Sequence, residues 1–155
     1  MRLLKRSNSK RGNAIIEFAL TASAMIPLLT GVTQFGHSFY MYNQLVSTVK
    51  GSARYASVAS YTSTTSTPAS DYTTAVKNMA VYGKTNPVTG NADLSLNDAP
   101  LVRGLATSNI AIDVTMNGSV PKDIKVKVVN FTIDSVFRSF TFNGKPHATY
   151  RYNGS

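Results

Sequence analysis

Two residues near the N-terminus combine types and a spacing that suit proteolytic processing and assembly. Gly12 ends a stretch without acidic residues that carries five basic ones: Arg2, Lys5, Arg6, Lys10 and Arg11. Glu17 lies five positions after Gly12 and directly precedes Phe18–Gly36, a run of 19 residues without formal charge. A glycine lets the backbone enter a protease cleft without a side chain in the way. Gly12 is therefore a candidate position for proteolytic processing.

Glu17 has two interpretations at this stage. A carboxylate costs about 2.5–3.5 kcal/mol at the centre of a bilayer and less near its interface, so a charge kept beside an apolar run suggests a specific partner. A carboxylate near a helix N-terminus at the membrane interface is also favourable without any partner. The residue taken alone fits both interpretations.

The net charge is concentrated in the first twelve residues. The chain has a formal charge of +9, and without the five basic residues of the leader the balance falls to +4. We therefore expect the leader to hold the N-terminus in the cytoplasm, and we do not expect a nucleic acid partner. The absence of cysteine excludes disulfides and thiolate metal sites, but it does not select a compartment.

Motifs for other chemistry are incomplete. Gly83-Lys84-Thr85 resembles the end of a phosphate-binding loop, but Asn78 stands where that loop needs a glycine, and a helical pattern precedes it. The two histidines, His37 and His147, have no cysteines to join them, so we expect no metal site. No Gly-x-Ser-x-Gly sequence is present, and we expect no catalytic residue, no cofactor and no enzyme activity. Lys125 and Lys127 alternate with apolar residues and are expected on the solvated face of a strand.

The pattern of apolar residues in the first third of the chain predicts one long helix. At about 1.5 Å per residue, Phe18–Gly36 comes close to crossing a hydrocarbon layer of roughly 30 Å. Apolar residues continue at helical spacing to about Ser60, which predicts a helix of roughly 70 Å, bent between Pro27 and Gly31. A secretory signal also begins with basic residues, but its apolar core is shorter. Four aromatic residues at the end of this run and just beyond it are expected as interface anchors or packing surface: Phe35, Phe39, Tyr40 and Tyr42.

The remainder predicts a small α+β domain. Residues 61–74 form a Ser/Thr-rich linker, Asp71–Tyr82 is expected to be a short helix capped by Asp71, and Lys84–Pro100 an irregular loop. The predicted divisions are a cleaved leader at 1–12, a helix at 13–60, a linker at 61–74 and a domain at 75–155.

Alternating apolar residues in the last third predict an antiparallel sheet of three or four strands. Asn117-Gly118 should turn the first strand (110–116) into the second, and Asn143-Gly144 should turn a strand at 136–142 into one at 147–152. The apolar phase shifts by one residue after Val128, which suggests a β-bulge. Four residues are expected to point inward: Ile112, Val114, Val126 and Phe131.

These features resemble known pilin precursors. Type IV prepilins are cut after a glycine that follows a basic leader, and they carry a glutamate at the fifth mature position. The resemblance implies cleavage between Gly12 and Asn13, with Glu17 as that glutamate. Residues 11–20, Phe35-Gly36, Tyr40 and the segment 53–56 are similar to the TadE-like family, whose members are minor pseudopilins of tight-adherence (Flp, type IVc) pili. The similarity covers about residues 10–60.

The resemblance implies a fold, a location and partners. The fold is a long transmembrane or filament-core helix followed by a small sheet domain, in a single-pass inner-membrane protein whose domain is periplasmic and later part of a pilus. The implied partners are a prepilin peptidase, the major pilin and other pseudopilins, an inner-membrane assembly platform and membrane lipid, within a homo- or hetero-oligomeric filament. Two alternatives stay open, namely the principal subunit of its own filament and a permanently membrane-tethered binding module.

Overall fold

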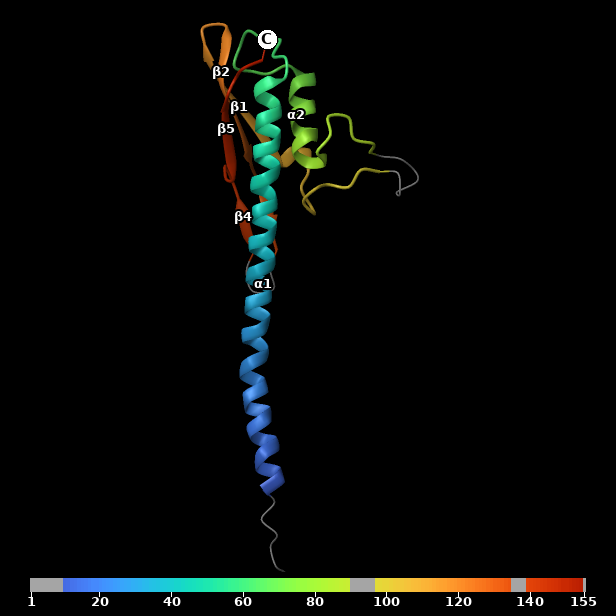
Figure 1. Cartoon of the computed structure of the whole chain (residues 1–155), viewed down its shortest axis with the longest axis vertical. Helices are drawn as coiled ribbons and strands as arrows, with labels where there is room; N and C mark the ends of the chain where they lie inside the picture. The colour runs from blue at the N-terminus through green and yellow to red at the C-terminus, as the bar shows by residue number, and fades with distance from the viewer. Residues whose placement is uncertain (1–9, 90–96, 135–138, 155) are drawn as a thin grey trace, which may run out of the picture. The chain divides into compact units, whose positions relative to one another are not determined.

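The computed structural model describes residues 10–89, 97–134 and 139–154, with the backbone alone for residues 10 and 11. The chain divides into two compact units, one up to His37 and one from Ser38 onward. Within the described residues, a long helix is followed by a shorter helix, a 3₁₀ turn and five short strands (Figure 1). The predicted α+β class, with a long apolar helix before a small antiparallel sheet region, is confirmed.

Helix α1 (Lys10–Val58) confirms the helix predicted for residues 13–60. It begins inside the basic stretch, and the helical assignment is unbroken through Pro27 and Gly31. The bend expected there stays a prediction. Arg2, Lys5 and Arg6 lie outside the described residues, as do the side chains of Lys10 and Arg11.

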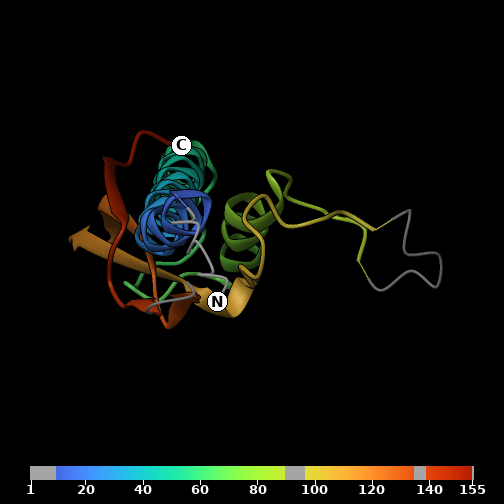
Figure 2. The ribbon, with the colours of Figure 1, turned by 90° about the horizontal axis from the view of Figure 1, so that it is seen from below.

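The C-terminal turns of α1 supply one wall of the core of the second unit. Leu45, Val49, Ala53 and Ala56 follow one another at intervals of three or four residues, which places them on one face of the helix, and all four are buried. In two views, these turns lie beside α2 (Ser70–Tyr82) on one flank and the strands of the sheet on the other (Figures 1 and 2).

Hydrogen bonds from distant residues complete the C-terminal end of α1. The last carbonyl groups of a helix have no donor further along it. The Tyr72 hydroxyl donates to the Ala56 carbonyl at 2.6 Å, and the Asn153 amide donates to the Ser57 carbonyl at 2.8 Å. The Tyr61 amide, just beyond the helix, donates to the Tyr152 hydroxyl at 3.0 Å. Helix α2 and the C-terminal segment therefore hold the same helix end.

Helix α2 begins at Ser70, one residue before the predicted start at Asp71. Ala69 is the N-cap and makes no side-chain hydrogen bond there, so the prediction that Asp71 caps the helix is wrong. Asp71 lies in the first turn instead, where a carboxylate interacts favourably with the free amides of the helix end. The helix ends at Gly83, whose φ of 72° is a left-handed conformation that glycine adopts without strain.

The larger sheet has three antiparallel strands. Strands β1 (Ile110–Asn117) and β2 (Val120–Val128) form the predicted hairpin after a 3₁₀ turn, η2 (Thr107–Asn109), and β5 (His147–Arg151) pairs with the other edge of β2. Val126 lies opposite Ile112 on β1 and Ala148 on β5.

The inward residues of the predicted sheet are confirmed. Val114, Val126 and Phe131 are buried, and Ile112 is half-buried against the same core. The alternation along β1 and β2 identified the buried face correctly because one face of this sheet packs on the core and the other faces solvent.

Two predictions about the strands are wrong. The phase shift after Val128 is not a bulge, because β2 ends there and the chain turns at Asn130, whose φ is 50°. The Asn109 side chain donates to the carbonyls of Val129 (3.2 Å) and Asn130 (2.9 Å) and so holds this turn. The register of the hairpin shifts instead between the pairs Thr115–Asp123 and Met116–Pro121, so the extra residue is Lys122 on β2.

The strands around Asn143-Gly144 also differ from the predicted hairpin. Strand β4 (Phe140–Phe142) pairs with β3 (Phe131–Ile133) in a separate two-stranded sheet, while β5 joins β2. The part of the predicted strand at residues 136–138 lies outside the described residues.

Candidate functional site: an apolar helix with one carboxylate

The predicted processing and assembly residues all lie in the N-terminal part of α1. Gly12, Asn13 and Glu17 are helical, and the side chains of Asn13 and Glu17 are exposed. Glu17 lies four positions after Asn13, which is about one turn of an α-helix. The two side chains therefore lie one above the other on a single face.

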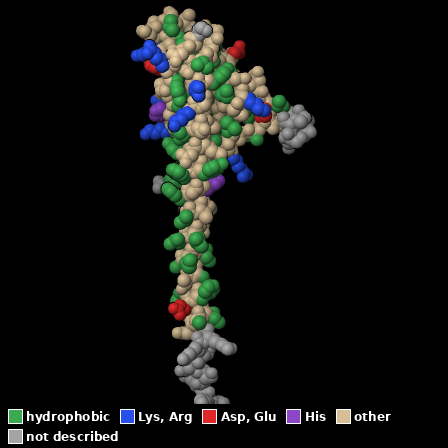
Figure 3. Space-filling view, in the orientation of Figure 1, with side chains coloured by type: hydrophobic (Ala, Val, Ile, Leu, Met, Phe, Trp, Pro, Cys, Tyr) green, Lys and Arg blue, Asp and Glu red, His purple; other side chains and the backbone are tan. Residues whose placement is uncertain are grey.

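The N-terminal unit exposes large apolar side chains all around the helix. Phe18 and Phe35 are each 75% exposed, and Figure 3 shows hydrophobic side chains along this segment. The other large apolar residues exposed within this unit are Ile15, Ile16, Leu20, Met25, Ile26, Leu28, Leu29 and Val32. A helix that is apolar on every side is normally buried, in a protein core or in a membrane. Within its own unit this segment is unburied, a pattern that is consistent with a helix covered by lipid or by other protein chains.

Hydroxyl groups in this apolar segment form hydrogen bonds within the helix. Thr21 donates to the Glu17 carbonyl at 2.9 Å, Thr30 to the Ile26 carbonyl at 2.8 Å, and Thr33 to the Leu29 carbonyl at 3.1 Å. Polar groups inside a hydrocarbon layer must be satisfied internally, because no water is available to them there. The threonines are therefore compatible with an apolar surrounding.

Glu17 is the exception to this internal pairing. It is the only charged residue between Gly12 and Gly36. In the part of the chain that the structure describes, no lysine, arginine or histidine forms a salt bridge with its carboxylate. An exposed carboxylate on an otherwise apolar helix is costly in lipid unless it lies at the interface or meets a cation from elsewhere.

Comparison with known families identifies this segment. Residues 12–54 match the family of TadE-like proteins. The match supports a pilin-like protein associated with the Tad pilus, and it confirms the predicted resemblance over the segment on which that prediction was based. No curated protein and no solved structure matches the chain.

The TadE-like segment lies entirely within α1. It starts at Gly12, the predicted cleavage residue, and stops at Arg54, shortly before the helix ends at Val58. Among the described residues, α1 from Gly12 onward is the one helix long and apolar enough to cross a membrane, which is consistent with membrane anchoring. Helix α2 and the sheets lie outside the TadE-like segment.

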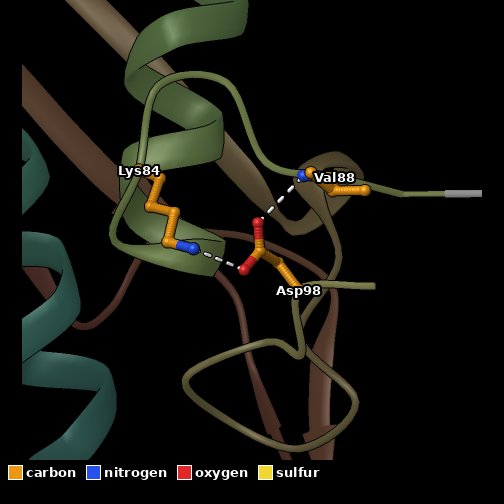
Figure 4. Close-up of polar contacts among 3 residues, drawn as sticks. All are labelled: Lys84, Val88 and Asp98. Carbon is orange, nitrogen blue, oxygen red and sulfur yellow. Dashed lines mark hydrogen bonds and ion pairs between the residues drawn. The ribbon is translucent and has the colours of Figure 1, made fainter. Parts of the chain in front are cut away.

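The remaining motifs have structural explanations. Gly83 of the Gly83-Lys84-Thr85 sequence is the C-cap of α2, and its amide donates to the Met79 carbonyl at 3.1 Å. The Lys84 ammonium lies 2.6 Å from one Asp98 oxygen, and the other oxygen accepts from the Val88 amide at 2.9 Å (Figure 4). These two hydrogen bonds lower the pKa of Asp98. Lys84 therefore holds a loop closed on its own chain.

The histidines and strand lysines do not form a metal site in the part of the chain that the structure describes. Among the residues that the structure describes, no group of three His, Cys, Asp or Glu side chains is placed to hold a metal ion. Lys127 forms an ion pair with Asp113 at 2.6 Å across the hairpin. Lys125 and Lys127 lie on the face of β2 opposite the buried Val126, as alternation predicts.

Sequence analysis missed contacts between residues far apart in the chain. Tyr42, expected as an interface anchor or as packing surface, packs on Phe142 of β4 with ring centroids 5.7 Å apart. Tyr61 makes edge contacts with Tyr72 and Tyr152 at 5.2 and 6.2 Å, near the end of α1. Local patterns cannot reveal such partners, and no signal in the sequence links them.

Proposed function

We propose that this protein is a minor pseudopilin of a tight-adherence pilus, a structural subunit without catalytic function. The TadE-like segment inserts α1 once into the inner membrane, with the basic leader in the cytoplasm and the second unit in the periplasm. The observation that carries the proposal is the exposed apolar surface of α1 across the segment that matches the TadE-like family. Such a surface is shielded from water first by lipid and then by the helices of neighbouring pilin subunits.

Processing is proposed between Gly12 and Asn13 by a prepilin peptidase. Gly12 has no side chain to obstruct the peptidase. A glycine also destabilises a helix by roughly 0.5–1 kcal/mol relative to alanine, which eases local opening of α1 around the scissile bond. The basic residues before Gly12 keep this bond at the cytoplasmic face.

Glu17 is proposed to pair with an α-amine created by that cleavage. The amine of Asn13 would be largely protonated at neutral pH. In a bundle of α1 helices, the carboxylate of one subunit meets the amine of its neighbour, because leaving either charge unpaired in an apolar interior is costly. Such pairs set the axial register between this subunit and the major pilin or a sister pseudopilin, on an inner-membrane assembly platform.

The test compares the wild type with Gly12→Val and a matched Gly31→Val control in cells that build the pilus. Gly31 lies in the same helix, and a Cβ atom added there meets no atom within 4 Å apart from its chain neighbours and the nearby backbone of the helix itself. Gly12→Val should accumulate as full-length membrane protein, while Gly31→Val should be processed like the wild type. Normal cleavage of Gly12→Val at the same bond would refute the processing site.

Fractionation separates the proposed role from its alternatives. A minor pseudopilin should co-purify with the major pilin in small amounts relative to it. A principal subunit would dominate sheared extracellular filaments. A tethered binding module would remain in the membrane fraction without pilin partners, and that result would refute the proposal.

A further inference from the structure

A hollow in the C-terminal unit has walls of two different kinds. Tyr42 and Val46 of α1 line one side, and Lys145, Pro146 and His147 at the start of β5 line the other, around a space of about 210 Å³. This is smaller than the roughly 300–1,000 Å³ of sites for drug-sized molecules or cofactors. It suits a small polar group with an apolar attachment.

The polar wall of the hollow is basic. Lys145 and His147 are exposed, and Figure 3 shows Lys, Arg and His side chains along the side of this unit that carries β2 and β5. In residues 12–89, 97–134 and 139–154, no carboxylate forms a salt bridge with Lys145, whereas Lys84 and Lys127 each have one. The ammonium of Lys145 is therefore available to an anion.

The other wall is apolar and well supported. Val46 and Tyr42 are half-buried, and the Tyr42 ring packs on Phe142. The ring is held by packing, so its position in the hollow does not depend on a ligand. An anion bound here would have its charge against Lys145 and an apolar stem against the helix.

The chain keeps this hollow close to the end of the apolar run. Six residues separate Gly36 from Tyr42, a distance of about 9 Å along a helix. Even a fully extended chain of this length spans no more than roughly 20 Å, whatever the arrangement of the two units. The headgroup layer begins where the hydrocarbon ends and is several ångströms thick, so the hollow is within reach of it.

We propose that the hollow binds the phosphate headgroup of an anionic phospholipid in the leaflet from which α1 emerges. The inference rests on membrane insertion of α1, which is part of the proposed function, but not on pilus assembly. The lipid phosphate lies against Lys145 and His147, and its acyl-bearing glycerol lies against Tyr42 and Val46. A free phosphate ion would gain nothing from the apolar wall.

The test measures lipid binding to the full chain in detergent micelles by native mass spectrometry. Phosphatidylglycerol and phosphatidylcholine are titrated separately into the wild type, Lys145→Gln and a Lys122→Gln control. Lys122 is exposed and does not line the hollow. On β2, the residue paired with His147 is Lys127. Lys122 lies five residues from Lys127 along the same strand, a distance of about 17 Å. The basic leader binds anionic lipid equally in all three proteins, so only differences between them count.

The wild type should prefer phosphatidylglycerol, and Lys145→Gln should weaken that binding about fivefold, the effect expected for one basic residue at an anionic surface. Lys122→Gln should bind like the wild type. Equal binding of phosphatidylglycerol by Lys145→Gln and Lys122→Gln would overturn the site. Displacement of the lipid by an equal concentration of inorganic phosphate would overturn the lipid as its ligand.

Carbonate extraction of membranes distinguishes failure of the headgroup site from failure of membrane insertion. A chain that stays inserted but shows no dependence on Lys145 refutes the headgroup site alone. A chain that carbonate releases refutes membrane insertion and the headgroup site together.

Discussion

Replacing Tyr72 with phenylalanine should destabilise the C-terminal unit by removing one hydroxyl group. That hydroxyl donates to the Ala56 carbonyl at 2.6 Å, in the last turns of α1. Tyr72 is only 6% exposed and Ala56 is fully buried, so water cannot replace the lost donor without rearrangement. Phenylalanine keeps the ring and its edge contact with Tyr61.

The size of the expected decrease in stability follows from the buried Ala56 carbonyl, which loses its hydrogen-bond donor. Leaving one buried hydrogen-bonding group without a partner costs about 1–3 kcal/mol, and we expect a decrease of that size in the free energy of unfolding at neutral pH. Burial also raises the pKa of the Tyr72 phenol, with a smaller contribution from nearby tyrosines.

The raised pKa makes this loss depend on pH. A phenol whose pKa is higher in the folded protein contributes its full stability below the unfolded value of about 10 and loses it as the pH rises further. The wild type should therefore lose about 1.4 kcal/mol per pH unit above 10 relative to Tyr72→Phe, which lacks this group. The difference between the two proteins should shrink in alkaline solution.

Urea unfolding of the full chain in detergent, followed by near-ultraviolet circular dichroism, measures this effect. Tyr82→Phe is the matched control, because Tyr82 is on the same helix and packs on the core. Within the described residues, its hydroxyl makes no hydrogen bond. Equal unfolding midpoints for Tyr72→Phe and Tyr82→Phe would refute the role of the hydroxyl, and a difference that widens above pH 10 would refute the pKa direction.

Three further predictions concern other parts of the chain. Glu17→Gln and Glu17→Val should be cleaved and inserted but lost from the pilin complex, with Glu17→Asp intermediate; undiminished co-purification of Glu17→Val with its pilin partners would leave only the interfacial role. Val126→Asp should unfold the C-terminal unit, because it buries an unpaired charge at a fully buried position, whereas Thr149→Asp, exposed opposite Lys125, should change thermal stability little. Gly51→Ala should raise the free energy of unfolding by about 0.5–1 kcal/mol, because the position is exposed in α1 and an added side chain meets nothing within 4 Å; a lower unfolding midpoint would contradict this.

The parts of the fold that were predictable depend on local patterns. The apolar run before His37 and the three- and four-residue spacing up to Ala56 identified α1, because helix periodicity is written in neighbouring residues. The hairpin of β1 and β2 was predictable for the same reason, from alternation around Gly118.

The parts that were not predictable depend on contacts over long sequence distances. The sequence allows β5 to pair with β4 across Asn143-Gly144, but β5 pairs with β2 instead, with Ala148 opposite Val126. The turn at Asn130 mimics a bulge in the sequence, since either feature shifts the apolar phase by one residue. Only the fold distinguishes them.

The candidate functional residues were likewise only partly predictable from the sequence. Gly12 and Glu17 could be selected as candidate residues because they belong to a short, contiguous sequence pattern. That pattern also lies at the start of the TadE-like match. The hollow beside Tyr42 is not recognisable from the sequence, because its other wall comes from Lys145 and His147, near the opposite end of the chain.

The most direct test of the proposed function is the intact mass of the protein recovered from the membranes of cells that build the pilus. We predict a chain that begins at Asn13, and a full-length chain in the Gly12→Val variant. A wild-type protein that still begins at Met1 in cells with an active prepilin peptidase would contradict the assignment as a processed pilin-like subunit.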